Sequence, residues 1–345
     1  MKNTKIYSLL DEKEYENSLN KASKIIIDGG IVAIPTETVY GLACDGLNPS
    51  AVHKIFEAKN RPLDNPLILH ISDFSWLDKL TQGLEAEDRK IVEKLWPGPL
   101  TIVLNRKDIV PDEITAGGDT VAVRMPKMKS TRDFIDYCQS PLAAPSANLS
   151  TKPSPTNAQD VYQDMQGRIE AILDGGESKI GLESTVLDLT SDRPTILRPG
   201  FYTLEYLRNF WPDVELDLAL KDQAKVPKSP GLKYKHYAPK AKVTVVVGQM
   251  EKVQDQFSQY ISKSKGKIGI MTFEEDNGNY PVDEVKYMGS IDNLEEMGRH
   301  LFTYLRDMDK LGVDEILVYG VEEEGYGLSI MNRLKKSASG NVIYL

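Results

Sequence analysis

Polar and apolar positions in the first part of the chain follow the spacing of helices and short buried strands. Apolar residues recur with helical spacing from Lys13 to Asp28, and Gly29-Gly30 ends this predicted helix before the apolar run Ile31 to Ile34. That run is short enough to form one buried strand. A second helix is predicted from Ser50, a suitable N-cap, to Lys59, before Pro62.

The remaining apolar runs predict further strands and helices in alternation. Strands are predicted at Pro66 to Ile71, Leu100 to Leu104, Thr120 to Arg124, Ile169 to Asp174, Ser184 to Leu189 and Thr195 to Arg198. Near the C-terminus we expect strands at Lys242 to Gly248, Gly266 to Thr272 and Glu315 to Gly320, and helices at Lys252 to Ser264, Asn293 to Leu311 and Leu328 to Ser337. Mixed α/β is the predicted class, with a Rossmann-like arrangement in the last part.

A change of composition predicts a domain boundary within the 345 residues, a length above that of a usual single domain. From Lys221 to Lys242 there are seven lysines against one acid, Asp222, and three prolines oppose regular structure. We therefore predict an N-terminal domain at residues 1–212, a basic linker at 213–241 and a C-terminal α/β domain at 242–345.

The charge of the chain argues against a protein whose main task is to bind nucleic acid. The formal net charge is −9, and the pI is near 5.2, whereas neutralising phosphates needs a basic surface. Residues 243–345 hold 11 Lys and Arg against 17 Asp and Glu, a net of −6. Any basic site must therefore be local.

The N-terminus and the cysteines favour a cytoplasmic protein. Met1 to Asp11 carries charges without an apolar centre, and no apolar run approaches the ~18 residues of a membrane span. Only Cys44 and Cys138 occur, without the spacing of a zinc site or a disulfide scaffold. We expect two buried thiols in a reducing compartment.

Two polar segments are the first candidates for a ligand site. Pro35 to Gly41 reads PTETVYG and follows a buried strand, the usual location of ligand groups in open α/β sheets, although a hydrogen-bonded turn explains it equally well. Lys59 to Pro66 reads KNRPLDNP and places two cations after a helix. They could complement the helix dipole or clamp phosphates. His70 ends the next strand, where a lone histidine is more often structural than catalytic.

Two later segments are also polar. Ala144 to Thr156 combines hydroxyls, an amide and prolines, so it is either a plain loop or a rigid loop that contacts ribose or phosphate. The segments GLESTVLD and ILRPG would pair as a hairpin, which would bring Ser184 and Arg198 close together. Arg124 also ends an apolar strand, although either arginine could lie on the surface.

Common nucleotide and hydrolase motifs do not occur in the sequence. Neither GxxxxGK[ST] nor GxGxxG is present, and there is no GxSxG or HExxH. The residues alone therefore indicate a polar, cation-bearing α/β cleft and no named reaction.

Six segments, in order along the chain, resemble the YrdC-like threonylcarbamoyl-AMP synthase family. They are PTETVYGLACD, KNRPLDNPL, VAVRMP, APSANLSTKPSPT, LESTVLDL and ILRPG. The segment SPGLKYKHYAPK and the α/β region after it are similar to the long, two-domain form. This resemblance implies an N-terminal open, twisted sheet with a large concave cavity, where L-threonine, bicarbonate or CO2, and ATP give threonylcarbamoyl-AMP and pyrophosphate for N6-threonylcarbamoyladenosine in tRNA.

The resemblance also implies roles for individual residues. Lys59 and Arg61 would be catalytic and bind the ATP phosphates. Other implied ATP contacts are Asn65, Thr120, Ser146, Asn148, Ser154 and Arg198, although Thr120 could touch either ligand. The implied threonine contacts are Thr38, His70, Arg124 and Ser184, with Arg124 as partner of the carboxylate. Magnesium would arrive with ATP, and no protein side chain is implied as a metal ligand.

The implied reaction needs no covalent protein nucleophile. The threonine amine attacks CO2 or bicarbonate to give a carbamate, whose oxygen attacks the α-phosphorus of ATP. We predict that Ser229 to Pro239 forms a lid that brings Tyr234 and Tyr237 near the nucleotide, the alternative being a solvated connector. The product would pass to a tRNA threonylcarbamoyl transferase complex, with at most weak direct tRNA binding and no membrane partner.

Two other functions remain open at this point. A concave cationic surface could bind double-stranded RNA directly, although the net charge opposes it. Carbamoyl transfer in hydrogenase maturation uses a related domain, but this chain lacks the cysteine clusters that accompany it.

Overall fold

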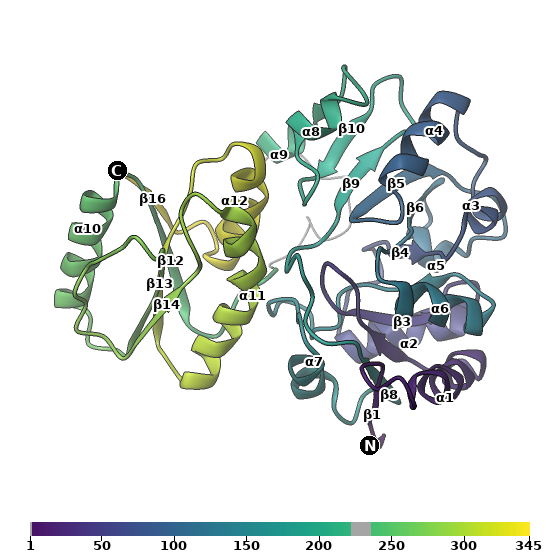
Figure 1. Ribbon diagram of the computed structural model, residues 1–345, viewed down its shortest axis with the longest axis horizontal. Helices are drawn as coiled ribbons and strands as arrows, with labels where there is room; N and C mark the ends of the chain where they lie inside the picture. Colours follow the sequence, from purple (N-terminus) through teal and green to yellow (C-terminus); the bar gives the residue numbers. More distant parts are fainter. Residues whose placement is uncertain (1, 222–235) are drawn as a thin grey trace. The chain divides into compact units, whose positions relative to one another are not determined.

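The computed structural model describes residues 2–221 and 236–345, which form two compact units (Figure 1). The first unit contains the described residues up to Lys221 except two short segments, Thr151–Pro153 and Ile180–Leu182. These segments group with the residues after 235 in the second unit. Residues 222–235 of the predicted linker lie outside the described residues, so the domain bounds given above stay a prediction.

An eleven-stranded mixed sheet is the centre of the first unit, with the order β1-β8-β2-β3-β7-β4-β6-β5-β9-β10-β11. Its strands are β1 Lys5–Ser8, β2 Val32–Ile34, β3 Gly41–Asp45, β4 Ile68–His70, β5 Leu100–Asn105, β6 Thr120–Arg124, β7 Leu142–Ala143, β8 Ala171–Asp174, β9 Thr185–Asp188, β10 Thr195–Arg198 and β11 Glu215–Leu216. All seven strands predicted before residue 200 are present. β1, β3, β7 and β11 were not predicted.

The helices of this unit are α1 Tyr15–Ile27, α2 Pro49–Lys59, α3 Phe74–Leu80, α4 Ala86–Leu95, α5 Asp112–Thr115, α6 Lys129–Cys138, α7 Ala158–Met165, α8 Leu204–Arg208 and α9 Leu218–Lys221. Ser50 was wrong as the N-cap of α2. The cap is Asn48, whose side chain accepts hydrogen bonds from the backbone N–H groups of Ser50 and Ala51. Pro49 then occupies the first helical position, where its missing N–H costs nothing.

Helices cover one face of the large sheet along much of its width. On that face, residues of α2, α3, α4 and α7 pack into one continuous apolar core with strands from β2 to β10. On the opposite face, α1 and α6 pack on strands β1, β8, β2, β3 and β7, through Leu19, Ile26, Phe134 and Ile135. We call this the helix-covered half. Cys44 and Cys138 are both free and buried, as predicted.

The rest of that opposite face is formed by β4, β6, β5, β9 and β10. It carries a small apolar cluster of Val103, Ala122, Val186 and Leu197, with Ile68 packed against it. Among the described residues, this cluster contains none from a helix. We call this part of the face, with the polar residues at its strand ends, the polar half.

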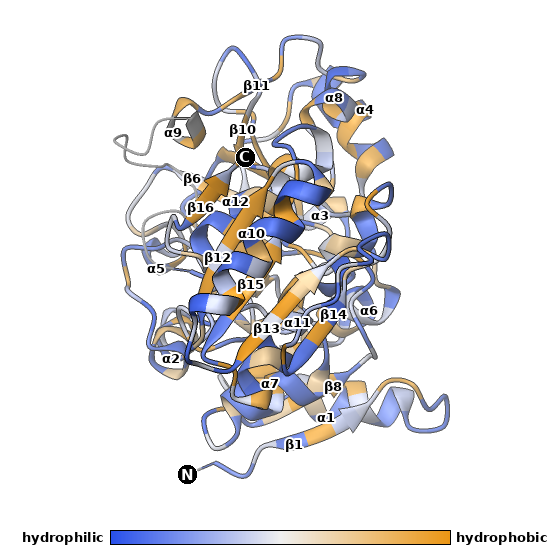
Figure 2. Ribbon diagram, turned by 90° about the vertical axis from the view of Figure 1, so that its left-hand side faces the viewer, coloured by the Kyte–Doolittle hydropathy of each residue, from blue (hydrophilic) through white to orange (hydrophobic). Residues whose placement is uncertain are grey.

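The second unit is a five-stranded parallel sheet between helices, in the order β14-β13-β15-β12-β16. The strands are β12 Lys242–Val247, β13 Ile268–Thr272, β14 Glu284–Tyr287, β15 Glu315–Tyr319 and β16 Val342–Tyr344. Helix α10, Met250–Lys263, lies on one side, and α11, Leu294–Leu311, and α12, Gly325–Ser337, lie on the other (Figure 1). Figure 2 shows hydrophobic strands and mixed helix surfaces, as expected for a sheet buried on both faces.

This arrangement confirms the predicted α/β class for the last part of the chain, a parallel sheet with helices on both faces, although β15 lies between β12 and β13, which are neighbours in the Rossmann order. The three predicted strands and three predicted helices are present, and α12 begins three residues earlier than predicted, at Gly325. None of the helices in residues 2–221 and 236–345 has the length and apolar character needed to cross a membrane.

Candidate active site

Side-chain alternation gathers polar residues on the polar half. In β6, Val121 and Val123 belong to the large apolar core, so Thr120, Ala122 and Arg124 face the other way. The strand register then places His70 of β4 on one side of Arg124 and Thr101 of β5 on the other. Directly paired residues of neighbouring strands lie on the same face, so these three side chains meet there.

Arg124 is buried and donates two hydrogen bonds to the loop that follows β2. Its Nη2 donates to Glu37 Oε1 at 2.6 Å, and its Nη1 donates to Thr38 Oγ1 at 2.8 Å. The two charged side chains are only 5% and 8% exposed, so water screens their attraction little. Arg124 is therefore a fixed guanidinium at the end of a buried strand and does not lie on the surface.

The loop between β2 and β3, Pro35 to Tyr40, is called the PTET loop here and is held by its own hydrogen bonds as well as by Arg124. Thr36 Oγ1 lies 2.8 Å from Thr38 Oγ1 and donates to Val39 O at 2.6 Å. Ser178 Oγ donates to Thr36 O at 2.9 Å. This segment is therefore a hydrogen-bonded turn that presents Glu37 and Thr38 to Arg124, and its role as a ligand site stays a prediction.

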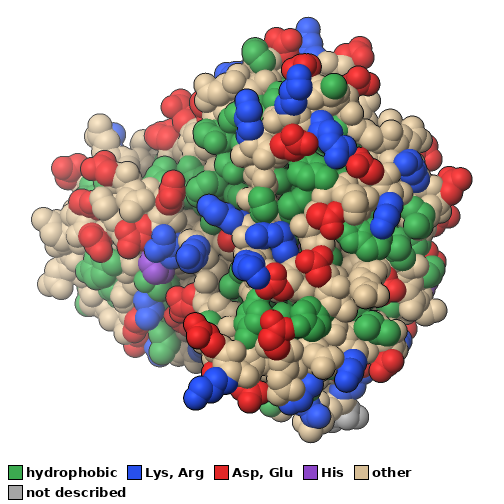
Figure 3. All heavy atoms as spheres, turned by 45° about the vertical axis from the view of Figure 1, so that its right-hand side comes forward, with side chains coloured by type: hydrophobic (Ala, Val, Ile, Leu, Met, Phe, Trp, Pro, Cys, Tyr) green, Lys and Arg blue, Asp and Glu red, His purple; other side chains and the backbone are tan. Residues whose placement is uncertain are grey.

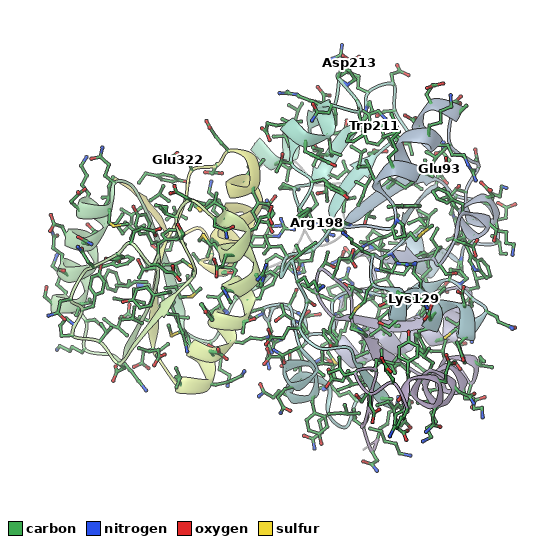
Figure 4. The ribbon with its side chains drawn as sticks, in the orientation of Figure 1. Glu93, Lys129, Arg198, Trp211, Asp213 and Glu322 are labelled. Carbon is green, nitrogen blue, oxygen red and sulfur yellow. The ribbon has the colours of Figure 1, made fainter. Side chains whose placement is uncertain are left out.

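The β9–β10 hairpin brings Ser184 and Arg198 together, as predicted. The strands pair antiparallel with an irregularity between Ile196 and Arg198. Arg198 donates from Nε to Ser184 O and from Nη2 to Ser184 Oγ, both at 3.1 Å. Ser184 Oγ also lies 2.7 Å from Thr101 Oγ1, which links the hairpin to the Arg124 strand. Arg198 lies at the end of β10, inside the first unit (Figure 4).

A glycine after β10 allows this close approach. A Cβ added to Gly200 would lie 2.3 Å from the backbone nitrogen of Thr185 and 2.6 Å from the carbonyl carbon of Ser184. Backbone atoms cannot give way as a flexible side chain does. The glycine of ILRPG therefore matters for packing at the hairpin.

Lys59 joins helix α2 to the loop that follows β7. Its side chain is buried, and Nζ donates to Asn148 O at 2.7 Å and to Ser146 O. The same loop is tied to the PTET loop, because Ala147 N donates to Tyr40 O at 2.8 Å. The structure thus brings Lys59, Ser146 and Asn148 together beside the segment that carries Thr38.

The other predicted ATP residues lie at several places around these loops. Arg61 braces its own segment, donating from Nη2 to Pro66 O at 3.1 Å and from Nε to Asn65 O at 3.4 Å. Ser154 is buried and donates to Glu183 Oε1 at 2.7 Å. Thr120 is partly buried at the start of β6, on the same face as Arg124.

The two tyrosines predicted for the lid are not placed in this group. Tyr237 belongs to the second unit, where its ring stacks on Phe302 with 5.0 Å between the ring centroids. Tyr234 lies outside the described residues. Their contact with ATP stays a prediction.

His70 is neutral at physiological pH. Its burial, and secondly the positive charge of Arg124, lower its pKa to about 3. Its Nδ1 lies 3.4 Å from Ile68 O. His70 can therefore offer a hydrogen bond without adding a second positive charge beside Arg124.

Three residues of this group were not proposed from the sequence. Glu37 was noticed only as an acid within PTETVYG, without a partner. Thr101 gave a usable signal, because it is the one hydroxyl in the apolar run Leu100 to Leu104, the pattern of a strand with one polar position. Glu183 gave none that we can identify.

Two family models match the chain one after the other. The model described as "Telomere recombination" matches residues 24–200, and "Threonylcarbamoyl-AMP synthase, C-terminal domain" matches residues 202–339. The threonylcarbamoyl-AMP synthase of Pyrococcus abyssi is 46% identical over 336 residues, which are 96% of this chain and 97% of the relative. The Bacillus subtilis threonylcarbamoyl-AMP synthase is 44% identical and covers 94% of this chain and 93% of its own length.

A solved structure agrees with these matches. The crystal structure of Pyrococcus abyssi Sua5 complexed with L-threonine has a TM-score of 0.92 to this chain at 44% identity, and the match covers 99% of each chain. The similarity therefore extends over both units and is not confined to the motifs. The chain belongs to the threonylcarbamoyl-AMP synthase family, in its two-domain form.

Proposed function

We propose that this chain makes L-threonylcarbamoyladenylate from L-threonine, bicarbonate or CO2, and ATP, with release of pyrophosphate, for N6-threonylcarbamoyladenosine formation in tRNA. The observation that carries the proposal is the convergence of Arg124, Thr38, His70 and Ser184 at adjoining strand ends, in a chain of this family. Such a nucleotidyltransferase needs an amino-acid site beside a nucleotide site.

In the proposed threonine site, Arg124 binds the substrate carboxylate. A guanidinium has five donors, and the bonds to Glu37 and Thr38 fix its plane. Thr38 and Ser184 supply hydroxyls that can donate or accept, and neutral His70 supplies an imidazole. This site binds a small polar molecule through fixed groups, which limits the reorganisation needed when it binds.

In the proposed ATP site, Lys59 and Arg61 act on the phosphates. The carbonyls of Ser146 and Asn148 hold the Lys59 ammonium at the edge of the loop after β7. The other proposed contacts to ATP are Asn65, Thr120, Ser146, Asn148, Ser154, Arg198, Tyr234 and Tyr237. The cations would neutralise charge that develops as the carbamate oxygen attacks the α-phosphorus.

Magnesium is proposed to enter on the ATP phosphates. In residues 2–221 and 236–345, no three His, Cys, Asp or Glu side chains are grouped so as to hold a metal ion, so we assign no protein ligands to it. Bound in this way, the ion would neutralise phosphate charge, while the chain's own task is to align the carbamate and exclude water.

The comparisons favour this enzyme over a double-stranded RNA-binding module. On the face drawn in Figure 3, basic side chains are interspersed with acidic ones, whereas duplex RNA would favour a continuous basic surface. We further propose that the product passes to a tRNA threonylcarbamoyl transferase complex in the cytoplasm, with weak direct binding of tRNA at most.

An omission assay tests the proposed function. Pyrophosphate release should require ATP, magnesium, bicarbonate and L-threonine together, and release that is indifferent to threonine would contradict the proposed substrate. Arg61→Ala should lower turnover by about 100-fold or more, because a donor to the developing phosphate charge is lost. Arg208→Ala, at an exposed position of α8, is the matched control and should leave turnover unchanged.

A further inference from the structure

We propose that Glu37 binds the α-ammonium group of the amino-acid substrate, through its Oε2 atom, beside the carboxylate site at Arg124. This inference rests on the proposed function and adds a residue to it that the motif-based assignment did not contain. It concerns recognition of the ammonium form, before the amine loses a proton.

The two oxygens of Glu37 have different surroundings. Oε1 accepts the 2.6 Å hydrogen bond from Arg124 Nη2. Oε2 is buried and accepts no hydrogen bond from the described residues. An ionised carboxylate can only accept, so this oxygen has lost water without gaining a donor from the protein. A buried polar atom of this kind indicates a missing water, ion or ligand group.

The charges around Glu37 match a zwitterion. Arg124 provides one positive pole, and Glu37 provides a negative pole in direct contact with it. His70 adds no charge, because burial and Arg124 lower its pKa to about 3. Tyr202 is also neutral, and the negative charge of Glu37 is one of the causes that raise its pKa to about 12, after burial and Tyr206.

The spacing of the two poles suits an α-amino acid. In such a substrate the carboxylate and the ammonium are attached to one carbon atom, so their partners must be adjacent. Arg124 and Glu37 are adjacent and buried, and both are held in place. Arg124 is fixed by its hydrogen bonds to Thr38 and Gly98. Glu37 is fixed because the hydrogen bonds of Thr36 hold the PTET loop. An ammonium group brings three donors, and a charge-assisted hydrogen bond to Oε2 would complete the carboxylate.

Glu37 could instead act only by positioning Arg124, and the Glu37→Gln variant separates the two roles. The amide oxygen can still accept from Arg124 Nη2, while the amide NH2 replaces Oε2 and cannot accept from an ammonium. The ligands are L-threonine and the 2,3-dihydroxybutanoate of the same configuration, in which a hydroxyl replaces the ammonium. Calorimetry would give Kd for both ligands with the wild type and with Glu37→Gln.

The expected result is a loss of affinity for threonine alone. Glu37→Gln should weaken threonine binding by about 10- to 100-fold, the range for a lost hydrogen bond to a charged group, and change the dihydroxy acid by less than about 3-fold. Equal weakening of both ligands would leave Glu37 as a positioning residue and overturn the proposal, as would unchanged binding of both. Glu12→Gln, at an exposed position, is the matched control and should bind both ligands like the wild type.

The wild type alone supplies a second test if Glu37→Gln folds poorly. Binding of the dihydroxy acid as tight as that of threonine would refute an ammonium site without any variant. The outcome also separates the two proposals. Threonine-dependent pyrophosphate release with no ammonium discrimination would reject this site and keep the enzyme, whereas discrimination without pyrophosphate release would reject the enzyme and keep the site.

Discussion

The two halves of one sheet face in the first unit have the same architecture and opposite chemistry. On the helix-covered half, the inward positions of β2, β3 and β7 are Val32, Ile34, Ala43 and Leu142, which pack under α1 and α6. On the polar half, strand-end residues of β4, β6 and β10 on the same face are His70, Arg124 and Arg198, all buried. The pleat is the same, but the residues placed on it differ.

The difference follows from what each half has to bury. Under α1 and α6 there is only apolar surface, so any charge there would lack a partner and would cost free energy. On the polar half, the loops after β2 and before β9 bring hydrogen-bonding groups to the strand ends, so Arg124 meets Glu37 and Thr38, and Arg198 meets Ser184. Loop composition therefore allows this part of the sheet to carry chemistry.

The largest expected effect is that of breaking the buried ion pair. Arg124→Ala should lower threonine-dependent pyrophosphate release by about 100-fold or more and should cost about 3–5 kcal/mol of unfolding free energy, because Glu37 is left buried without its partner. Urea unfolding followed by tryptophan fluorescence measures this unit, since Trp76, Trp96 and Trp211 all belong to it.

The double variant Arg124→Met with Glu37→Leu sharpens this result. It removes both charges, so stability should largely return while activity stays low. If Arg124→Ala were as stable as the wild type, the ion pair of Arg124 and Glu37 would not be buried in solution as it is in this structure.

The helix-covered half should respond in stability alone. Leu19→Ala removes a fully buried side chain of α1 and should cost about 2–5 kcal/mol, while turnover per folded molecule stays unchanged. Leu10→Ala is the matched control, since Leu10 is 65% exposed and its truncation should change stability by less than about 0.5 kcal/mol. A large loss of turnover in folded Leu19→Ala would mean that the two halves are coupled.

Much of the fold could be predicted, because long apolar runs bounded by glycine or proline carry a local signal. The strands at Leu100, Thr120 and Thr195 were found in this way. β3 begins at Gly41, directly after the PTET loop, so the alternation of a strand cannot be told from the turn before it. β7 has only two residues and is too short to show an alternation. Their places are set by pairing with strands distant in sequence, β7 lying between β3 and β4.

The site was predictable where its partners are close in sequence. Ser184 and Arg198 are 14 positions apart, and a hairpin pattern was enough to pair them. Glu37 and Arg124 are 87 positions apart, and Lys59 and Ser146 are also 87 apart. No local pattern specifies such contacts, because they depend on the order of strands across the sheet. Motif resemblance identified the positions of Arg124 and Lys59, but only the structure supplied Glu37 as a partner.

The smallest of these effects concerns pH and tests whether His70 is buried without charge. Its pKa falls from the ordinary 6.5 to about 3 in the folded protein, through burial first and Arg124 second. Below about pH 6.5 the unfolded chain therefore binds a proton that the folded chain does not, so stability falls as the pH is lowered from 6.5 toward 3. Lowering the pH from 7.5 to 5.5 should therefore lower the free energy of unfolding by about 1.4 kcal/mol through His70.

His70→Asn carries no titrating ring and should lose about 1.4 kcal/mol less than the wild type over the same interval, as measured by urea unfolding at both values of pH. His53→Asn removes a histidine whose side chain is 48% exposed and is the matched control. This variant should show the same change in the free energy of unfolding between pH 7.5 and 5.5 as the wild type. An equal pH dependence in His70→Asn and the wild type would show that His70 takes up its proton in the folded state, and the polar half would then hold two positive charges at the Arg124 strand end instead of one.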